Sequence, residues 1–379
     1  MPTARVRIAP PGPPSGPESS QRLTKRHRLH IVLLAGSVAC LLVAVTVVAV
    51  GMNAEPAPVA APARATDQAT SEPVAGSTQA VVVTTPAAPP APSVPAAGGW
   101  LPVDAAAQAA AKAAFFATVP KPVTGNPVKV PEFNASCKVS HHGSDDPIVF
   151  PGLAGASHNH TFIGNKTTNA RSTAESLRAA GTTCEPAQDH SAYWIPTLYQ
   201  SGNVVDPTGV TVYYGSRLKD PSKTQPFPFG LRMIAGDPAV QADTNKQGNH
   251  FFCAGIGGEV GRTADGVFPI CAKTAVLNRQ IVFPDCWDGK HLDSPNHKAH
   301  MANGAAGGVC PASHPVPIPS VSFVIAYPLG VDTSGITLSS GTSFSMHADF
   351  FNAWEPDALA ARVRNCVDQA VKCNSAGNF

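Results

Sequence analysis

The sequence lacks the short motifs that identify most nucleotide-dependent and many hydrolytic enzymes. It contains no P-loop, no G-x-G-x-x-G element, no G-x-S-x-G elbow and no H-E-x-x-H. Nucleotide cofactors, α/β-hydrolase chemistry and zincin-type proteolysis are therefore disfavoured. No C-x-x-C pair occurs either, which argues against a zinc ribbon and a thioredoxin-type redox site.

An excess of charge of one sign is also missing. The 379 residues include 27 Lys and Arg against 25 Asp and Glu, a formal net charge of +2. Binding to nucleic acid needs a basic face that neutralises phosphates. The only basic cluster is short and lies at residues 22–28, so the sequence does not predict nucleic acid as a partner.

A long apolar run directly follows this basic cluster. It covers residues 31–52 without a charge, and about 20 apolar residues are enough to span a bilayer. The run is longer than a signal-peptide core and ends without a good cleavage site. It predicts an uncleaved anchor in the plasma membrane, with residues 1–30 as a disordered cytoplasmic tail and the remainder extracellular. The alternative is a cleaved signal peptide and a secreted protein.

Two further segments precede the folded domain. Residues 53–103 are mostly Ala, Pro, Val, Thr and Ser, a composition typical of an extended spacer. Asp104 then precedes an alanine-rich run, which predicts a capped helix within a connector at residues 104–130. We expect one extracellular domain at residues 131–379, which is long enough for a single core.

The domain has the sequence pattern of antiparallel β structure. Gly, Pro, Asn and Asp clusters separate short strand-like runs. These runs lie at residues 193–199, 209–214, 279–283 and 319–327. Helical patterns are limited to residues 172–180 and to the stretch that begins at Pro356. The prediction is a mainly β domain, an antiparallel β-sandwich or jelly-roll-like fold with long loops and a C-terminal helix.

Cysteine usage is consistent with an exported domain. Cys40 lies in the apolar run, and the other eight allow up to four disulfides. Pairing of chain neighbours is preferred, Cys253 with Cys271 and Cys286 with Cys310. Cys366 and Cys373 are seven residues apart, about 10 Å along a continuous helix. They are therefore too far apart to bond unless the helix ends between them.

The most specific metal signal is the pair His158 and His160. On a strand these two side chains point to the same face, and paired imidazoles on β structure are a common set of transition-metal ligands. Three interpretations remain open: a site for a divalent transition metal, a polar binding or catalytic site without metal, and a structural hydrogen-bonding role. The identity of any cofactor is unknown at this point.

A second pair, His347 and Asp349, also shares one strand face. A carboxylate beside an imidazole suits a general base or a support for a metal ligand, and a buried ion pair is the equal alternative. Asp189 precedes two aromatic residues, Tyr193 and Trp194. If exposed, these rings would suit the apolar faces of a sugar; otherwise they belong to the core.

The polar segment at residues 283–301 is the richest in candidates. It has little apolar periodicity, so it is expected either to present groups to a ligand or to cap its own turns. Its candidate residues are Trp287, Asp288, Asp293, His297 and His300. A further candidate, His314, lies between Cys310 and prolines, a rigid position that suits a site residue.

Ordered blocks along the domain carry a resemblance. They read DPIVFPG at 146–152, SHNHTF at 157–162, YWIPTLY at 193–199, RMIAGDP at 232–238, FPDCWDG at 283–289, LDSPNHKAHM at 292–301, CPASHPVP at 310–317 and HADFFNAW at 347–354. Together they resemble the domain-of-unknown-function family numbered nineteen ninety-six, found in secreted proteins of filamentous fungi and actinobacteria. Some fungal relatives carry cellulose-binding or cell-wall sensor modules, so the resemblance implies a wall or polysaccharide context without assigning a reaction.

Two classes of function follow. The first is a carbohydrate-active enzyme, a hydrolase or a lyase that acts on cell-wall or extracellular polysaccharide. The expected catalytic residues are Asp288, Asp349, His347, His297, His300 and Asp189. The expected ligand-binding residues are Trp287, Asp293, His314, Tyr193 and Trp194. The second class is a non-catalytic carbohydrate- or metal-binding surface protein, for which His158 and His160 are the metal ligands.

Overall fold

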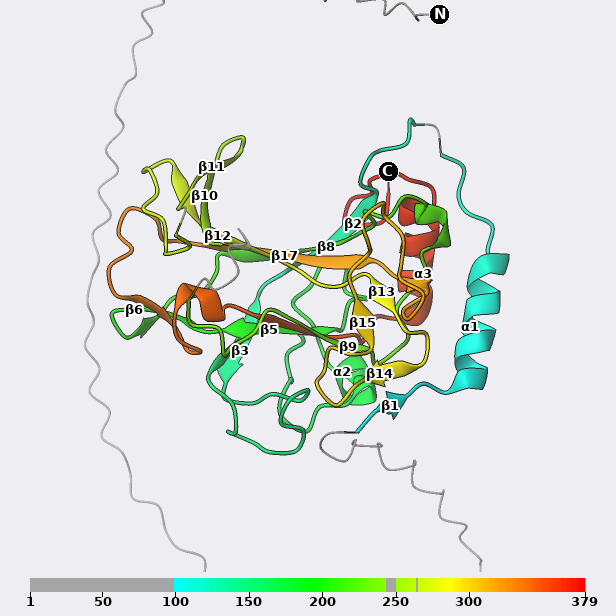
Figure 1. The fold of residues 1–379 in the computed structure, drawn as a ribbon, viewed down its shortest axis with the longest axis horizontal. Helices are drawn as coiled ribbons and strands as arrows, with labels where there is room; N and C mark the ends of the chain where they lie inside the picture. Colours follow the sequence, from blue (N-terminus) through cyan, green and yellow to red (C-terminus); the bar gives the residue numbers. More distant parts are fainter. Residues whose placement is uncertain (1–98, 124, 243–249, 264, 379) are drawn as a thin grey trace, which may run out of the picture. The chain divides into compact units, whose positions relative to one another are not determined.

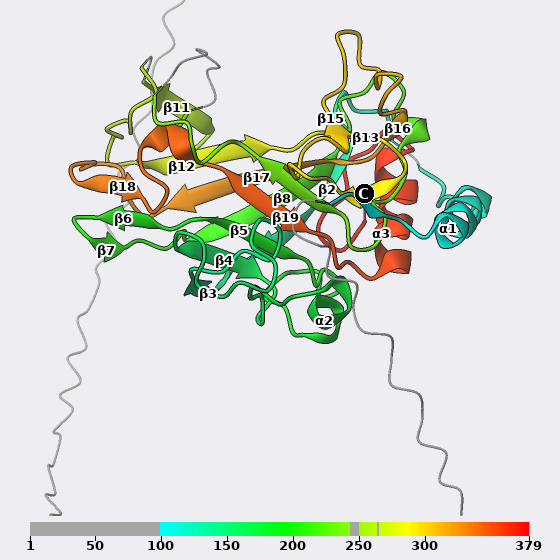
Figure 2. The same cartoon turned by 60° about the horizontal axis from the view of Figure 1, so that its bottom comes forward.

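The computed structural model describes residues 99–379, except 124, 243–249, 264 and 379. The predicted tail, the membrane anchor and nearly all of the spacer lie outside this part of the chain. Among the described residues no helix is both long and apolar enough to cross a bilayer. The domain consists mainly of antiparallel strands arranged in two large sheets that lie one above the other (Figures 1 and 2).

The first large sheet has six strands in the order β11-β10-β12-β17-β8-β2. Their bounds are Gly258–Arg262 (β11), Phe252–Gly255 (β10), Ala275–Val282 (β12), Ser320–Tyr327 (β17), Gly209–Gly215 (β8) and Glu132–Cys137 (β2). Strand β17 pairs with both β12 and β8 in antiparallel register. In β8 the buried and half-exposed side chains alternate, because one face of the sheet packs on the core and the other faces solvent.

The second large sheet has five strands in the order β3-β4-β5-β19-β9. Their bounds are Val139–Gly143 (β3), His160–Gly164 (β4), Ala192–Pro196 (β5), Ala348–Phe351 (β19) and Arg232–Ala235 (β9). Strands β4, β5 and β19 are buried along their whole length. Both faces of this sheet are therefore covered, one by the first sheet and the other by loops and helix α2, Ala174–Ala179 (Figure 2).

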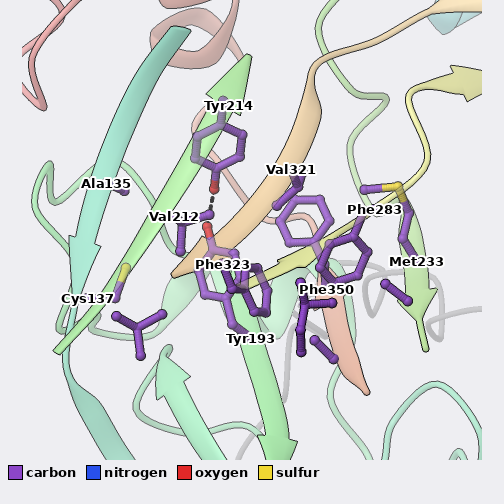
Figure 3. Packing of buried hydrophobic residues seen from close by; sticks show 14 of the residues in the cluster. Ala135, Cys137, Tyr193, Val212, Tyr214, Met233, Phe283, Val321, Phe323 and Phe350 are labelled. Carbon is purple, nitrogen blue, oxygen red and sulfur yellow. Dashed lines mark hydrogen bonds between the residues drawn. The ribbon is translucent and has the colours of Figure 1, made fainter. Parts of the chain in front are cut away.

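The main core lies between the two sheets. Tyr193 and Phe350 from the five-stranded sheet stack with ring centroids 5.4 Å apart, and Tyr193 meets the edge of Phe323 from β17. Figure 3 shows these rings converging with Phe283 and Met233 between the strands. Each such side chain contributes about 1.5–3 kcal/mol when it leaves water, so this layer is the principal source of stability.

Three smaller sheets and short elements complete the domain. One small sheet pairs β1 (Leu101–Pro102) with β14 (His291–Asp293). The second has the order β15 (Met301–Ala302), β13 (Cys286–Trp287) and β16 (Val316–Pro317). The third has the order β18 (Ile336–Leu338), β6 (Leu198–Gln200) and β7 (Asn203–Val204). Helix α1, Ala105–Ala117, is capped by the Asp104 side chain, as predicted. Helix α3, Pro356–Arg362, continues into a π-helical segment, η3, Val363–Val367. Single 3₁₀ turns occupy Pro221–Lys223 (η1) and Ser343–Ser345 (η2).

The coarse fold prediction is therefore confirmed: the domain is mainly β, antiparallel and ends in a helix. Four disulfides are also present, and the preferred pairs Cys253–Cys271 and Cys286–Cys310 both form. Cys366 and Cys373 also bond, because the helical segment ends at Val367 and the chain turns back, which is the condition under which the sequence allows this pair. The remaining bridge joins Cys137 to Cys184.

Candidate metal centre

Three histidines converge on the outer face of the five-stranded sheet. His160 is the first residue of β4, His158 lies two residues before it, and His347 directly precedes β19. Strand β5 pairs with β4 on one side and β19 on the other. On this face the side chains of residues 158, 160 and 162 alternate with those of the inner face, as do those of 347, 349 and 351. The sheet thereby joins two sequence patterns that are far apart in the chain.

The three imidazole rings offer one nitrogen each within a small volume. These nitrogens all lie within 4.8 Å of one another. The ring of His158 is 4.3 Å from His160 and 4.9 Å from His347, measured between centroids. Zn–N bonds are about 2.0–2.1 Å long, so a small inward movement of the rings brings all three nitrogens to one ion.

Hydrogen bonds orient two of these rings. His160 Nδ1 lies 2.9 Å from the carbonyl oxygen of Asp145, and His347 Nδ1 lies 2.8 Å from that of Ser345. Since a carbonyl only accepts, each Nδ1 donates its hydrogen and each Nε2 keeps its lone pair. Backbone carbonyls fix the tautomer of metal-binding histidines in this way.

The nitrogens that face the cluster have no hydrogen-bond partner. Nε2 of His158 and Nε2 of His160 are buried without a partner among the described residues. Nε2 of His347 lies 4.0 Å from Oδ2 of Asp349, which is too far for a hydrogen bond. Buried polar atoms without partners are rare and costly in folded proteins, so these atoms point to a ligand.

Electrostatics keeps these imidazoles neutral. Burial lowers the pKa of His158, and it lowers that of His160 well below the ordinary value, with the other two rings adding to the effect. Burial also lowers the pKa of His347, to about 4. Neutral imidazole is the form that binds a metal ion, so the site is ready for a cation at neutral pH.

Two buried carboxyl groups lie next to the cluster. Asp349 is 1% exposed, and its Oδ2 accepts no hydrogen bond from any described residue. Burial raises its pKa well above the usual value, and the neighbouring Asp146 adds to this effect. Burial also raises the pKa of Asp146, to about 6. The hydrogen bonds that its side chain accepts from the backbone of Ile148 and Val149 lower this pKa but offset only part of the rise. Both groups therefore favour the protonated form more than exposed carboxyls do.

The residues present fit a transition metal. Three neutral nitrogen donors with second-layer hydrogen bonds to carbonyls are the ligand set of open zinc and copper sites. His160 and His347 are buried, whereas His158 is half-buried and borders solvent. A second cluster, Cys137, Cys184 and Asp189, is excluded because the two cysteines form a disulfide.

The polar segment 283–301 forms part of the surroundings of this centre. Lys298 Nζ donates to the carbonyl oxygen of Gly236 at 2.7 Å. Gly236 lies against His347, because a Cβ placed on it would come within 2.8 Å of the His347 Cα. The positive charge of Lys298 also lowers the pKa of both His347 and Asp349. Sequence reasoning missed Lys298 and Asp146 as members of the site, although both lie in the blocks quoted above.

The other candidates of this segment have hydrogen-bonding roles in the loop. His300 Nε2 donates to the carbonyl oxygen of Arg232 at 2.7 Å, and its Nδ1 faces Ser294 Oγ at 3.0 Å. Asp293 pairs with His297 at 3.0 Å and, more loosely, with buried Arg232 at 3.4 Å. These contacts attach the loop to β9, so His300, Asp293 and His297 position the segment.

Asp288, Trp287 and His314 also form contacts within loops. Asp288 Oδ1 accepts from the backbone of Lys290 and His291, and its Oδ2 contacts the His291 ring at 2.5 Å. Trp287 is 1% exposed and donates to the His291 carbonyl. His314 faces the carbonyl oxygen of Ala299 at 3.0 Å. These three are not joined to the histidine cluster by any contact among the described residues.

Asp189, Tyr193 and Trp194 are core residues. All three side chains are fully buried, so the two rings do not form an exposed platform for sugars. The Tyr193 hydroxyl donates to Asp189. It also contacts the Tyr214 hydroxyl (Figure 3). Trp194 packs on the outer face of its sheet with Phe162, near His160. Their place in the interior supports the core interpretation that the sequence left open.

Comparison with known proteins gives a family but no activity. No curated protein and no solved structure matches the chain. A family model described as "Domain of unknown function (DUF1996)" matches residues 146–354, which is more than half of the chain and includes all three histidines and both buried carboxyls. The chain therefore belongs to the DUF1996 family.

Proposed function

We propose that this chain is a membrane-anchored extracellular protein whose domain holds a divalent transition metal at His158, His160 and His347. In this proposal the domain acts through that centre on a cell-wall or other extracellular polysaccharide, as a hydrolase or a lyase. The observation that supports it is the convergence of three neutral imidazole nitrogens, two of which are buried without a hydrogen-bond partner.

The chain's own residues supply the framework of the centre. The carbonyls behind His160 and His347 hold both rings in the ligand tautomer. The outer face of the sheet excludes water from two of the three ligands. A bound metal supplies charge stabilisation and lowers the pKa of a water molecule in its open position. Asp349 lies beside His347, with its Oδ2 4.0 Å from the ring Nε2, and burial raises its pKa well above the usual value.

A glycosidase mechanism with two carboxylates has less support than metal-assisted chemistry. Such an enzyme needs two carboxyl groups that both reach the scissile bond. Asp288 is engaged in capping its own turn, and Asp349 is fully buried beside the histidines. Asp189 is enclosed in the core. Asp349 and Asp189 are therefore shielded from solvent, and half-buried Asp288 is engaged by its own turn.

The proposed location rests on residues 31–52 as anchor and 53–103 as spacer. Four disulfides in the described domain support an oxidising compartment. A spacer rich in Pro and Ala extends the domain away from the membrane surface. The partners in this proposal are therefore the membrane, through the anchor, and a wall polymer, through the domain.

Elemental analysis of the full-length protein, purified in detergent, tests the metal centre. We expect a stoichiometric transition metal in the wild type and its loss in His158→Ala plus His160→Ala. His141→Ala is the matched control, because His141 lies on the neighbouring strand β3 and is absent from the cluster. A metal-free wild type, or a double variant that retains the metal, contradicts the proposal.

A non-catalytic metal- or carbohydrate-binding protein is the second candidate. It is favoured by the burial of His160, His347 and Asp349, each at most 3% exposed, because a bulky substrate reaches only the side of His158. A panel of wall polysaccharides separates the two candidates. Release of sugar that depends on the metal supports the enzyme, whereas metal binding without turnover supports the binding protein.

A further inference from the structure

The charge balance of the metal centre indicates what occupies its open side. All three ligands are imidazoles, and no carboxylate belongs to the ligand cluster. A divalent ion held by neutral ligands keeps its full charge, which favours an anion in the remaining position. Asp349, whose Oδ2 lies 4.0 Å from His347 Nε2, and Asp146 are buried side chains that the cluster of described ligand atoms does not include.

Lys298 adds a second positive charge near His347. Its ammonium group is held by the Gly236 carbonyl, and Gly236 contacts His347. Lys298 is exposed, so its two remaining N–H groups are available to a ligand that arrives from solvent.

The loop that carries Lys298 is rigidly built. Asn296 Oδ1 accepts from the backbone N–H of Lys298 at 3.2 Å and from that of Ala299 at 2.8 Å. Ser294 Oγ also accepts from the Ala299 N–H at 2.9 Å. His297 adopts a positive φ of 57° in the same turn, a conformation that is uncommon outside glycine. A turn with these constraints fixes the position of the ammonium group relative to His347, as recognition of a ligand requires.

We propose that the open side of the centre takes a carboxylate, such as that of a uronate residue in an acidic polysaccharide, between the metal and the Lys298 ammonium group. The inference rests on the proposed function and narrows its substrate class. Entry is past His158, the one ligand with a solvent-exposed side. Lys298 acts in this arrangement as a binding residue, and it is not part of the metal ligand set.

Binding of galacturonate to the cobalt-loaded, full-length protein tests this inference. The visible absorption of Co²⁺ reports directly on a new ligand in its coordination sphere. We expect galacturonate to change the spectrum and methyl galactoside, its neutral counterpart, to leave it unchanged. Lys298→Met is expected to raise the Kd for galacturonate by about tenfold, the effect of one charge-assisted hydrogen bond, while Lys298→Arg stays within about twofold.

Controls separate this inference from the metal site itself. Lys372→Met removes an exposed lysine that pairs with Glu132 elsewhere, and it is expected to bind galacturonate as the wild type does. Metal content and the unfolding midpoint of Lys298→Met are measured in parallel, because a merely structural Lys298 would change stability and leave the Kd unchanged. That result overturns the inference.

The remaining outcomes are equally decisive. A spectrum that responds to methyl galactoside as it does to galacturonate also overturns the inference. A spectrum that responds to phosphate but not to galacturonate overturns it as well. Failure of the wild type to bind any transition metal overturns the proposed function and, with it, this inference. A metal-loaded protein with a Kd that is insensitive to Lys298 overturns the inference alone.

Discussion

At the scale of single residues, His158 illustrates a conflict between stability and binding. Its buried Nε2 has no partner among the described residues, and such an atom costs about 1–3 kcal/mol. When a chelator has removed the metal, we expect His158→Leu to be at least as stable as the wild type. At a free metal concentration of about 100 times the Kd, the free energy of unfolding of the wild type alone is expected to rise, by about 2.7 kcal/mol. Urea unfolding under both conditions measures this reversal. Equal responses of the two proteins to metal would contradict it.

Asp189 gives a prediction about pH. Burial raises its pKa from 3.8 to about 6, so the folded protein holds this proton more tightly than the unfolded chain does. The stabilisation is complete below about pH 4 and is lost as the pH rises to about 6, by about 3 kcal/mol in total. Asp189→Asn removes this dependence. Urea unfolding between pH 4 and 7 is expected to show a smaller decline in the variant, and parallel curves would be inconsistent with the assignment.

The candidate residues show how far a sequence pattern extends. The strand alternation that groups His158 with His160, and His347 with Asp349, is a local property, and the sequence predicts both pairs. Their convergence depends on strand β5 lying between β4 and β19, a non-local pairing that no local pattern contains. Asp288 was predicted as catalytic from its neighbours alone, and the backbone N–H groups it caps explain its place in the loop.

At the scale of elements, the strands and helix caps were predictable because they depend on neighbouring residues. Asp104 caps α1 as its sequence indicates, and the runs at 209–214 and 319–327 correspond to β8 and β17. The order of the strands within each sheet was not predictable, since it reflects contacts between distant segments. The Cys366–Cys373 bridge stayed conditional for a related reason: the end of the helical segment at Val367, which allows the bond, carries no Gly or Pro signal.

Helix α1 is attached to the domain by few contacts, which predicts local opening. Phe115 is its only buried residue, and Arg364 lies over that ring. We expect Phe115→Ala to speed amide hydrogen exchange throughout α1 and to leave exchange in β17 unchanged. Phe116→Ala is the matched control, because the neighbouring ring is 37% exposed. A uniform increase in exchange across the domain would instead mean that α1 unfolds only together with the core.

At the scale of the whole molecule, the disulfides differ in what they constrain. Cys137–Cys184 joins β2 of the six-stranded sheet to the segment that leads into β5 of the other sheet, across a sequence separation of 47. Cys253–Cys271 spans 18 residues and lies in a small separate cluster with Ala275. In the unfolded chain, the first bridge therefore links segments that belong to different sheets of the folded domain. The second bridge links only segments from one margin of the domain.

This difference leads to a prediction for global stability. Replacement of Cys137 and Cys184 by Ala is expected to lower the free energy of unfolding by about 4 kcal/mol, because closure of a long loop restricts the unfolded chain most. The Cys253→Ala plus Cys271→Ala variant serves as the comparison and is expected to lose less, with faster hydrogen exchange limited to β10 and β11. Urea unfolding of both variants gives the two values. If the shorter bridge proved the more important one, the margin formed by β10 and β11 would have to be part of the main cooperative unit. The two sheets would then not be the layers on which global stability depends.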